Sequence, residues 1–278
     1  SAGSITYNDN KAVDLEDISG VQITNDGTIE TEDGTSKQIA INAESSLNTT
    51  ITNNGTINSD NKYGVILNYA ENVVITNNAG ATISADGNTA IYGKNVGNCH
   101  FNGTNCHSDL SGQSNGVGLT LHNHGTITST HETVWLGSGS SGVHRSKGIK
   151  IYNYDGGIIK TTDEGDSPIK GFHLVDFEII NYEGATIESA DRHVVNTEQS
   201  EDINFTNNGT MTATSKSAFY CKTCSDVTFN NTGTMTSGNN AVVISNGDNI
   251  SVTNSGTITA TTDNSGLNIS SSDGTVVT

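Results

Sequence analysis

Ile51-Thr52-Asn53-Asn54-Gly55-Thr56-Ile57 is the stretch that decides the fold, because variants of it recur along the whole chain. Large apolar residues alternate with threonine on both sides of an Asn-x-Gly corner, which is the period-two pattern of two half-buried strands. The recurring asparagines are Asn25, Asn53, Asn77, Asn123, Asn153, Asn181, Asn207, Asn231 and Asn254. Most of their spacings fall between 23 and 30 residues, and this is the period of one solenoid coil.

A second short apolar run follows most copies of the phrase, as in Val65-Ile66-Leu67. Two or three short strands per repeat, with no helical period, predict an all-β chain that forms a right-handed parallel β-helix of about ten coils. The corner glycines are expected to supply positive φ. The repeated asparagines are expected to hydrogen-bond from coil to coil along the rod.

We expect one domain over residues 1–278, because no linker or shift in composition divides the chain. An irregular region spans about 93–148. Within it, residues 98–104 loosely follow the repeat and predict a degenerate coil, whereas residues 137–148 and 161–168 are expected to form protruding loops.

The composition restricts the function. The 278 residues carry 12 basic and 30 acidic side chains, a net charge of −18, and only 32% are hydrophobic. Low apolar content with high charge is also typical of disorder, but the strict repeat indicates a thin core instead. Clustered basic residues are absent, so we expect no nucleic-acid partner. No apolar run is long enough to insert in a membrane. The chain starts at Ser1 without a leader, so we expect that any signal peptide has been removed.

The four cysteines form two close pairs, Cys99 with Cys106 and Cys221 with Cys224. About five coils would separate the pairs, which excludes one four-thiolate zinc site. No helix N-terminus is predicted that would activate a redox thiol. Two local disulfides are therefore expected, and they indicate an oxidising extracellular compartment.

The recurring Asn-Asn-Gly-Thr-Ile and Asn-Asn-Ala-Gly-Ala-Thr-Ile phrases, from about Val21 to Ile269, resemble passenger domains of bacterial autotransporters, notably the AIDA-I and antigen 43 group of self-associating adhesins. The resemblance implies display on the bacterial cell surface, adhesion, aggregation and biofilm formation. It also implies an outer-membrane anchor, a C-terminal barrel that this short sequence lacks. We therefore expect a fragment or a processed passenger.

The outward threonines form two ladders that suit a flat polar face able to bind another copy of the chain. The residues expected to carry this self-association are Thr24, Asp26, Thr28, Thr52, Asn54, Thr56, Thr76, Asn78 and Thr82. A solvated face with no partner is the plainer interpretation, since threonine favours strands in its own right.

A second hypothesis places a host-glycan or protein-receptor site in the 99–146 region, with His122, His124 and Trp135 as contacts. His122 and His124 also suggest a transition-metal pair, and residues 163–166 a calcium loop. Both patterns fit an ordinary polar surface better, so no metal and no cofactor is expected. The net charge disfavours strongly anionic glycans.

A polysaccharide-cleaving enzyme is the third interpretation. Hydrolases need two carboxylates at a set separation, but Asp109, Asp155, Glu183 and Asp202 show no common register. No nucleophile elbow is present. We therefore expect no catalytic residues.

Overall fold

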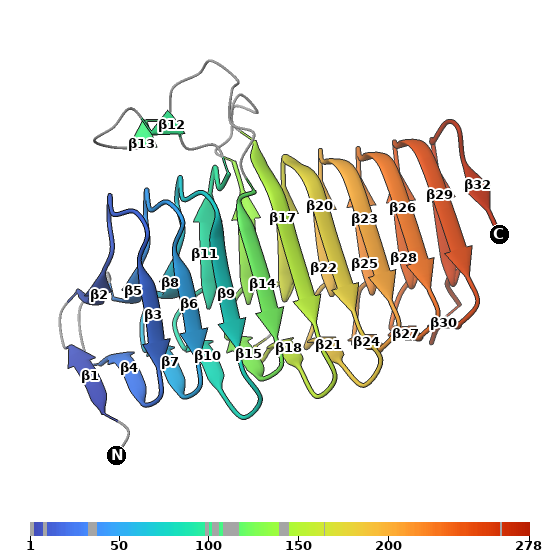
Figure 1. Ribbon diagram of the computed structural model, residues 1–278. Helices are drawn as coiled ribbons and strands as arrows, with labels where there is room; N and C mark the ends of the chain where they lie inside the picture. Colours follow the sequence, from blue (N-terminus) through green and yellow to red (C-terminus); the bar gives the residue numbers. More distant parts are fainter. Residues whose placement is uncertain are drawn as a thin grey trace.

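The repeated phrases fold into three parallel sheets that enclose one narrow core (Figure 1). The computed structural model describes residues 3–7, 10–32, 38–97, 100–101, 106–107, 117–138, 145–163, 165–261 and 263–278. Each sheet takes one strand from every coil and has ten strands, so the chain makes nine full turns between its first and last strands. The parallel β-helix predicted from the sequence is confirmed, with three strands per coil.

Sheet 1 holds the strands that follow the Asn-x-Gly corner. In order along the rod they are β1 (Ser4–Tyr7), β4 (Thr28–Thr31), β7 (Thr56–Ser59), β10 (Thr82–Ala85), β15 (Thr126–Ser129), β18 (Ile158–Thr161), β21 (Thr186–Ser189), β24 (Thr210–Ala213), β27 (Thr234–Ser237) and β30 (Thr257–Ala260).

Sheet 2 holds the second apolar run of each coil. Its strands are β2 (Lys11–Asp14), β5 (Ile39–Asn42), β8 (Tyr63–Ile66), β11 (Ile91–Lys94), β16 (Val134–Gly137), β19 (Ile169–Phe172), β22 (Val195–Glu198), β25 (Phe219–Lys222), β28 (Val242–Ser245) and β31 (Leu267–Ser270).

Sheet 3 holds the strands that precede the corner asparagine. Its strands are β3 (Gln22–Asn25), β6 (Thr50–Asn53), β9 (Val73–Asn77), β14 (Leu119–Asn123), β17 (Ser146–Asn153), β20 (Leu174–Asn181), β23 (Glu201–Asn207), β26 (Ser225–Asn231), β29 (Asp248–Asn254) and β32 (Val276–Val277).

The core is one side chain deep from each sheet. Register pairs like residues on successive coils, as with Ile29, Ile57 and Ile83 in sheet 1. Near the C-terminal end the layers become larger, because Phe205 and Phe229 stack at 5.0 Å between ring centroids. The low apolar content of the chain is therefore enough to fill a rod interior.

A ladder of nine asparagines runs beside this core, as predicted, and all but the exposed Asn254 are buried. Each amide Nδ2 donates to the Oδ1 of the asparagine on the next coil, from Asn25 to Asn254, at 2.7–2.9 Å. Most of these amides also donate to backbone carbonyls at the corner, as Asn53 does to Gly55 and Thr82. The ladder satisfies backbone groups that would otherwise be buried without partners.

The expectation that every Asn-x-Gly corner needs positive φ is wrong. Gly27, Gly55 and Gly233 have ordinary φ values. A Cβ on Gly55 would lie 2.0 Å from the carbonyl oxygen of Gly27 on the preceding coil. Glycine is required there because the corners of neighbouring coils stack backbone on backbone. At the corner between sheets 3 and 1, positive φ occurs in the longer versions of the repeat, as at Gly80 and Gly156.

Positive φ is instead concentrated at the corner between sheets 2 and 3. In one row of this corner, His173, Gln199, Thr223 and Asn246 have φ between 52° and 55°. A second row includes Asp176, Asp202 and Asp226. The first row gives little sign in the sequence, because its residues are of many types, whereas the positive-φ residues of the second row are Gly, Asn and Asp, which adopt this conformation most readily.

The degenerate coil predicted at residues 98–104 is wrong. Strand β9 pairs directly with β14, and β11 with β16, so the coil ladder continues across this region. Strand β12 (His100–Phe101) pairs with β13 (Cys106–His107) in an antiparallel manner, in a two-stranded sheet separate from the three sheets of the rod. Between 98 and 116 the sequence has only Phe101 and Leu110 as large apolar residues, too few to supply three inward rows.

The two predicted loops are shorter than expected. Residues 146–148 belong to strand β17, and residues 139–144 lie outside the described residues. Residues 162–163 and 165–168 follow β18 without strand structure, but Ser167 and Pro168 are buried. The second loop therefore packs on the rod.

Candidate functional site at the edge between sheets 3 and 1

The nine residues predicted for self-association lie together. Register places Thr24, Thr52 and Thr76 in one outward row of sheet 3. Sheet 1 carries the matching row of Thr28, Thr56 and Thr82. The corner residues Asp26, Asn54 and Asn78 lie between these two rows. The nine therefore form a three-by-three array on three successive coils, which we call the polar patch.

Hydrogen bonds hold the middle row of the polar patch in place. The Asn54 amide Nδ2 donates to Asp26 Oδ1 at 2.7 Å, and the Asn78 amide donates to Asn54 Oδ1. Asn53 and Asn77 of the buried ladder fix the backbone directly beneath. The patch is therefore rigid, and little side-chain entropy remains to be lost when it meets a partner.

The edge that contains the patch is poor in charge. Six of the nine segments that run from sheet 3 over the corner into sheet 1 contain no Asp, Glu, Lys or Arg: 50–58, 74–84, 120–128, 204–212, 228–236 and 251–259. The other three, 22–30, 150–160 and 178–188, carry Asp26, Glu30, Lys150, Asp155, Lys160, Glu178, Glu183 and Glu188. Other corners of the rod carry rows of carboxylates, such as Asp176, Asp202 and Asp226 between sheets 2 and 3. The net charge of −18 is therefore spread unevenly around the rod.

Two of these three rows, the sheet 3 row and the corner row, carry aromatic residues on the next three coils, whereas the sheet 1 row continues as Thr126, Ile158 and Thr186. His122 and Tyr152 continue the sheet 3 row, and His124, Tyr154 and Tyr182 continue the corner row. We call these five residues the aromatic band. The His124 and Tyr154 rings stack at 4.2 Å between centroids, and the Tyr154 and Tyr182 rings at 4.8 Å, both almost parallel.

Hydrogen bonds tie the band together. His122 Nδ1 lies 2.9 Å from the Tyr154 hydroxyl, and the Tyr152 hydroxyl donates to Glu178 Oε2 at 2.7 Å. Burial, with a smaller contribution from His124, lowers the pKa of His122. Burial and the Glu178 hydrogen bond raise the pKa of Tyr152. The band presents ring edges and polar tips, because the stacked ring faces cover one another.

Trp135 does not lie with His122 and His124. It is on strand β16 of sheet 2, where it stacks on Tyr92 at 4.8 Å, and Tyr92 stacks on Tyr63 at 4.4 Å. Burial and the neighbouring Tyr92 raise the pKa of Tyr63 to about 12. The three receptor contacts predicted from the sequence are thus divided between two faces of the rod.

The sequence analysis missed Tyr152, Tyr154 and Tyr182. The signal was present: Tyr154 and Tyr182 directly follow the repeated asparagines Asn153 and Asn181, at the position held by Asn54 and Asn78 in other coils. Aligning that single corner position would have revealed the band.

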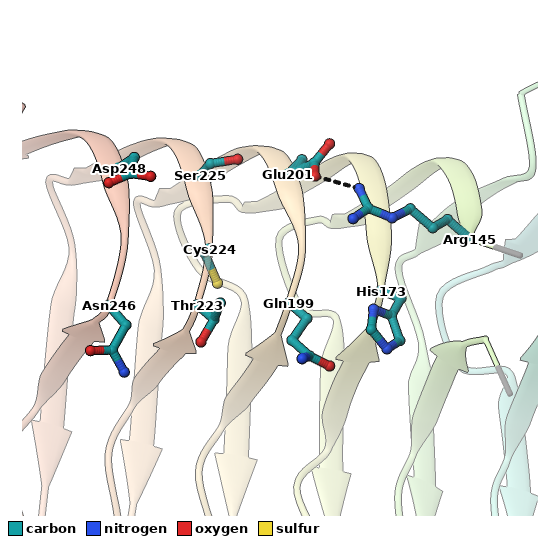
Figure 2. A pocket seen from close by; sticks show the side chains of 9 residues that line it. All are labelled: Arg145, His173, Gln199, Glu201, Thr223, Cys224, Ser225, Asn246 and Asp248. Atoms are coloured by element: carbon teal, nitrogen blue, oxygen red, sulfur yellow. Dashed lines mark ion pairs between the residues drawn. The ribbon is translucent and has the colours of Figure 1, made fainter. Parts of the chain in front are cut away.

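A polar groove lies at the corner between sheets 2 and 3 (Figure 2). It has a volume of about 300 Å³, and one wall is the row of His173, Gln199, Thr223 and Asn246. The Arg145 guanidinium pairs with Glu201 at 2.6 Å in the opposite wall. The groove results from one backbone corner repeated on successive coils.

Cys224 lies between the two walls of this groove and is disulfide-bonded to Cys221, with 6.0 Å between the Cα atoms. This predicted disulfide is confirmed. Cys99 lies outside the described residues, so its pairing with Cys106 remains a prediction.

The acidic residues weighed as catalytic groups are only partly scattered. Asp155 and Glu183 occupy equivalent exposed positions on neighbouring corners, so the expectation that they share no register is wrong. Asp202 lies at another corner, and Asp109 is outside the described residues. Asp166 of the acidic loop faces Lys170 at 3.8 Å, and Glu164 is not described. Among the described side chains, no group of three or more His, Cys, Asp or Glu is placed to hold a metal ion.

No protein-family profile, curated protein or solved structure matches this chain. None of the described residues forms a helix that is long and apolar enough to cross a lipid bilayer.

Proposed function

We propose that this chain is a segment of a bacterial cell-surface adhesin that binds another copy of itself through the polar patch. The observation that carries the proposal is a regular array of nine side chains on a charge-poor edge of a highly acidic rod. These side chains bear hydroxyl, amide or carboxylate groups. Display outside the cell agrees with the Cys221–Cys224 disulfide. Aggregation and biofilm formation would follow from contact between chains on neighbouring cells.

Charge explains why this edge would be used. Two rods of net charge −18 repel each other, and contact through the corner between sheets 2 and 3 would bring the row of Asp176, Asp202 and Asp226 to the interface. The polar patch brings only Asp26 from each copy. Each hydrogen bond across the contact contributes about 0.5–1.5 kcal/mol, so association depends on many bonds forming together and on many copies per cell.

Sedimentation velocity over a concentration series tests this proposal. Thr56→Glu puts a carboxylate in the centre of the sheet 1 row of the patch, and we expect it to abolish the concentration-dependent shift seen for the unchanged chain. Ser245→Glu is the matched control, because Ser245 lies on sheet 2 in the row that already holds Glu198. Equal association by both variants would contradict the proposal.

Solution conditions give a second readout. Moderate salt screens the repulsion between rods, and mild acid protonates carboxylates, so both should tighten self-association. A chain that sediments as a monomer at high concentration under all of these conditions would overturn the proposal.

The aromatic band favours a second function, which is binding to a host glycan or surface protein. Five aromatic residues on three coils form the largest cluster of rings among the described residues. Tyrosine and histidine edges combine apolar contact with hydrogen-bonding tips. The contacts for this function would be His122 and His124 with the three tyrosines, whereas Trp135 would belong to a separate surface.

Host-cell binding by purified protein separates the two functions. Tyr154→Ala with Tyr182→Ala should abolish host-cell binding and leave self-association unchanged, whereas Thr56→Glu should do the reverse. Deleting residues 99–116 tests whether the insertion contributes to the receptor site. Product detection on a panel of polysaccharides would expose the third interpretation, a glycan-cleaving enzyme.

A further inference from the structure

Three strands near the C-terminal end of sheet 1 carry a regular plate of threonines. Register aligns Thr210, Thr234 and Thr257 in one column and Thr212, Thr236 and Thr259 in the next. The strands β24, β27 and β30 lie side by side in Figure 1. We call these six residues the threonine plate. It differs from the polar patch in having two threonines per strand.

The plate is free of charge and open to solvent. Segments 208–214, 232–238 and 255–261 contain no charged residue, although the chain has 30 acidic side chains. Four of the six threonines are exposed and two are half-buried. In the part of the chain that the structure describes, none of the six hydroxyls has a hydrogen-bond partner, so all six are available to an external ligand.

The plate is also held rigidly. The residues between the threonines point inward, and Met211 and Met235 are fully buried. The backbones of β24, β27 and β30 are paired along their length. β-Branched side chains on strands have restricted rotamers. The hydroxyls and methyls are therefore fixed in a two-dimensional grid.

The grid has the spacings of a β-sheet. Hydroxyls on neighbouring strands are about 4.8 Å apart, and alternate residues along a parallel strand are about 6.6 Å apart. These two repeats are close to the repeat distances of water oxygens on exposed faces of hexagonal ice. A rigid, neutral grid of hydroxyls at these spacings can hydrogen-bond water oxygens that are spaced as in ice, and no charged side chain of the plate would hold its water in another arrangement.

We propose that the threonine plate binds ice. The plate suits an ordered water surface better than a protein partner, since protein interfaces depend on tryptophan, tyrosine and arginine anchors that fill pockets, and the six residues of the plate are all threonine. An ice lattice is matched instead by a flat surface with regularly repeated groups. The inference is independent of self-association through the polar patch, which lies on other coils.

Thermal hysteresis and inhibition of ice recrystallisation by the purified chain test this inference. The unchanged chain should depress the freezing point below the melting point and suppress recrystallisation. Thr234→Lys with Thr236→Lys places two charges in the centre of the plate. This variant should reduce both effects to the level given by serum albumin, the negative control. Circular dichroism and a melting curve establish that this variant is folded.

Thr126→Lys with Thr128→Lys is the matched control, because it makes the same double change in the same two rows of sheet 1, outside both the plate and the polar patch. It should retain full ice activity. The inference is overturned if the unchanged chain has no ice activity, if the plate variant keeps it, or if the control loses it equally. It is also overturned if the unchanged chain forms a dimer and has no ice activity, and the plate variant no longer forms that dimer. The plate would then be a protein interface.

Discussion

The polar patch and the aromatic band occupy the same rows of the same edge, yet their chemistry is different. On the three coils of the patch the corner row is Asp26, Asn54 and Asn78. On the next three coils the same row is His124, Tyr154 and Tyr182. Beneath both regions the buried asparagine ladder continues without a break.

The difference shows which positions of the repeat specify the fold and which are left for function. Inward residues and the ladder asparagines are nearly constant, because every coil must fit the one before it. Outward residues change without affecting the stacking. Functional sites in this rod are therefore expected at two kinds of outward row. In one kind the residue type changes from coil to coil, and in the other the row keeps the same uncharged residue over several coils.

The largest effect is expected from the ladder that the two regions share. Asn53→Ala beneath the polar patch and Asn153→Ala beneath the aromatic band each remove a donor and an acceptor and leave buried neighbouring amides unpaired. Each variant should lose roughly 3–5 kcal/mol of unfolding free energy, measured by urea denaturation. A clearly smaller loss in one region would show that the ladder is not equally important along the rod.

Acid should weaken the rod through a histidine outside the patch. Burial, with Lys216 and Arg192 nearby, lowers the pKa of His193 to about 4, and its Nδ1 accepts a hydrogen bond from the Ser217 N–H at 3.2 Å. The unfolded chain binds the proton first, so stability is intact above about pH 6.5 and falls by about 3 kcal/mol as the pH drops to 4.

His193→Asn keeps an acceptor in this position and removes the titrating group. It should flatten the stability profile between pH 6.5 and 4, measured by chemical denaturation at a series of pH values. Asn54→Ala in the polar patch should leave the shape of the profile unchanged. Identical profiles for the unchanged chain and His193→Asn would contradict this assignment.

A smaller effect separates the corner rows themselves. Tyr154→Ala removes two stacked contacts, with His124 and Tyr182, and should cost about 1–3 kcal/mol. Asn54→Ala at the equivalent position removes exposed hydrogen bonds and should cost less than about 1 kcal/mol. Thermal melts of both variants measure the difference. Equal losses would mean that the rings of the band do not support one another.

Much of this architecture could be predicted because the repeat carries its own register. Once Asn25, Asn53 and Asn77 are aligned, the neighbouring threonines fall into rows, and the nine patch residues form one array. The close approach of Gly55 to Gly27 could not be predicted, since a glycine required by packing and one required by φ look alike in a sequence.

Relations between different sheets were beyond the sequence. The phrase and the apolar run that follows it are joined by corners of variable length, so nothing in the sequence shows that Trp135 faces away from His122. The first row of the corner between sheets 2 and 3 was missed because residues as different as Tyr69 and Asn95 adopt its positive φ. The prediction of a coil at residues 98–104 was wrong because this segment matches the repeat only loosely and lacks the apolar residues that a coil must bury.

Oxidative trapping of dimers tests the central claim most directly, that copies meet through the polar patch. Thr52→Cys puts a thiol in the middle of the sheet 3 row of the patch, and Ser245→Cys puts one on sheet 2. We expect mild oxidation to give covalent dimers of Thr52→Cys at concentrations where the chain self-associates, and few of Ser245→Cys. Equal yields from both variants, or dimers formed only through Ser245→Cys, would contradict the account.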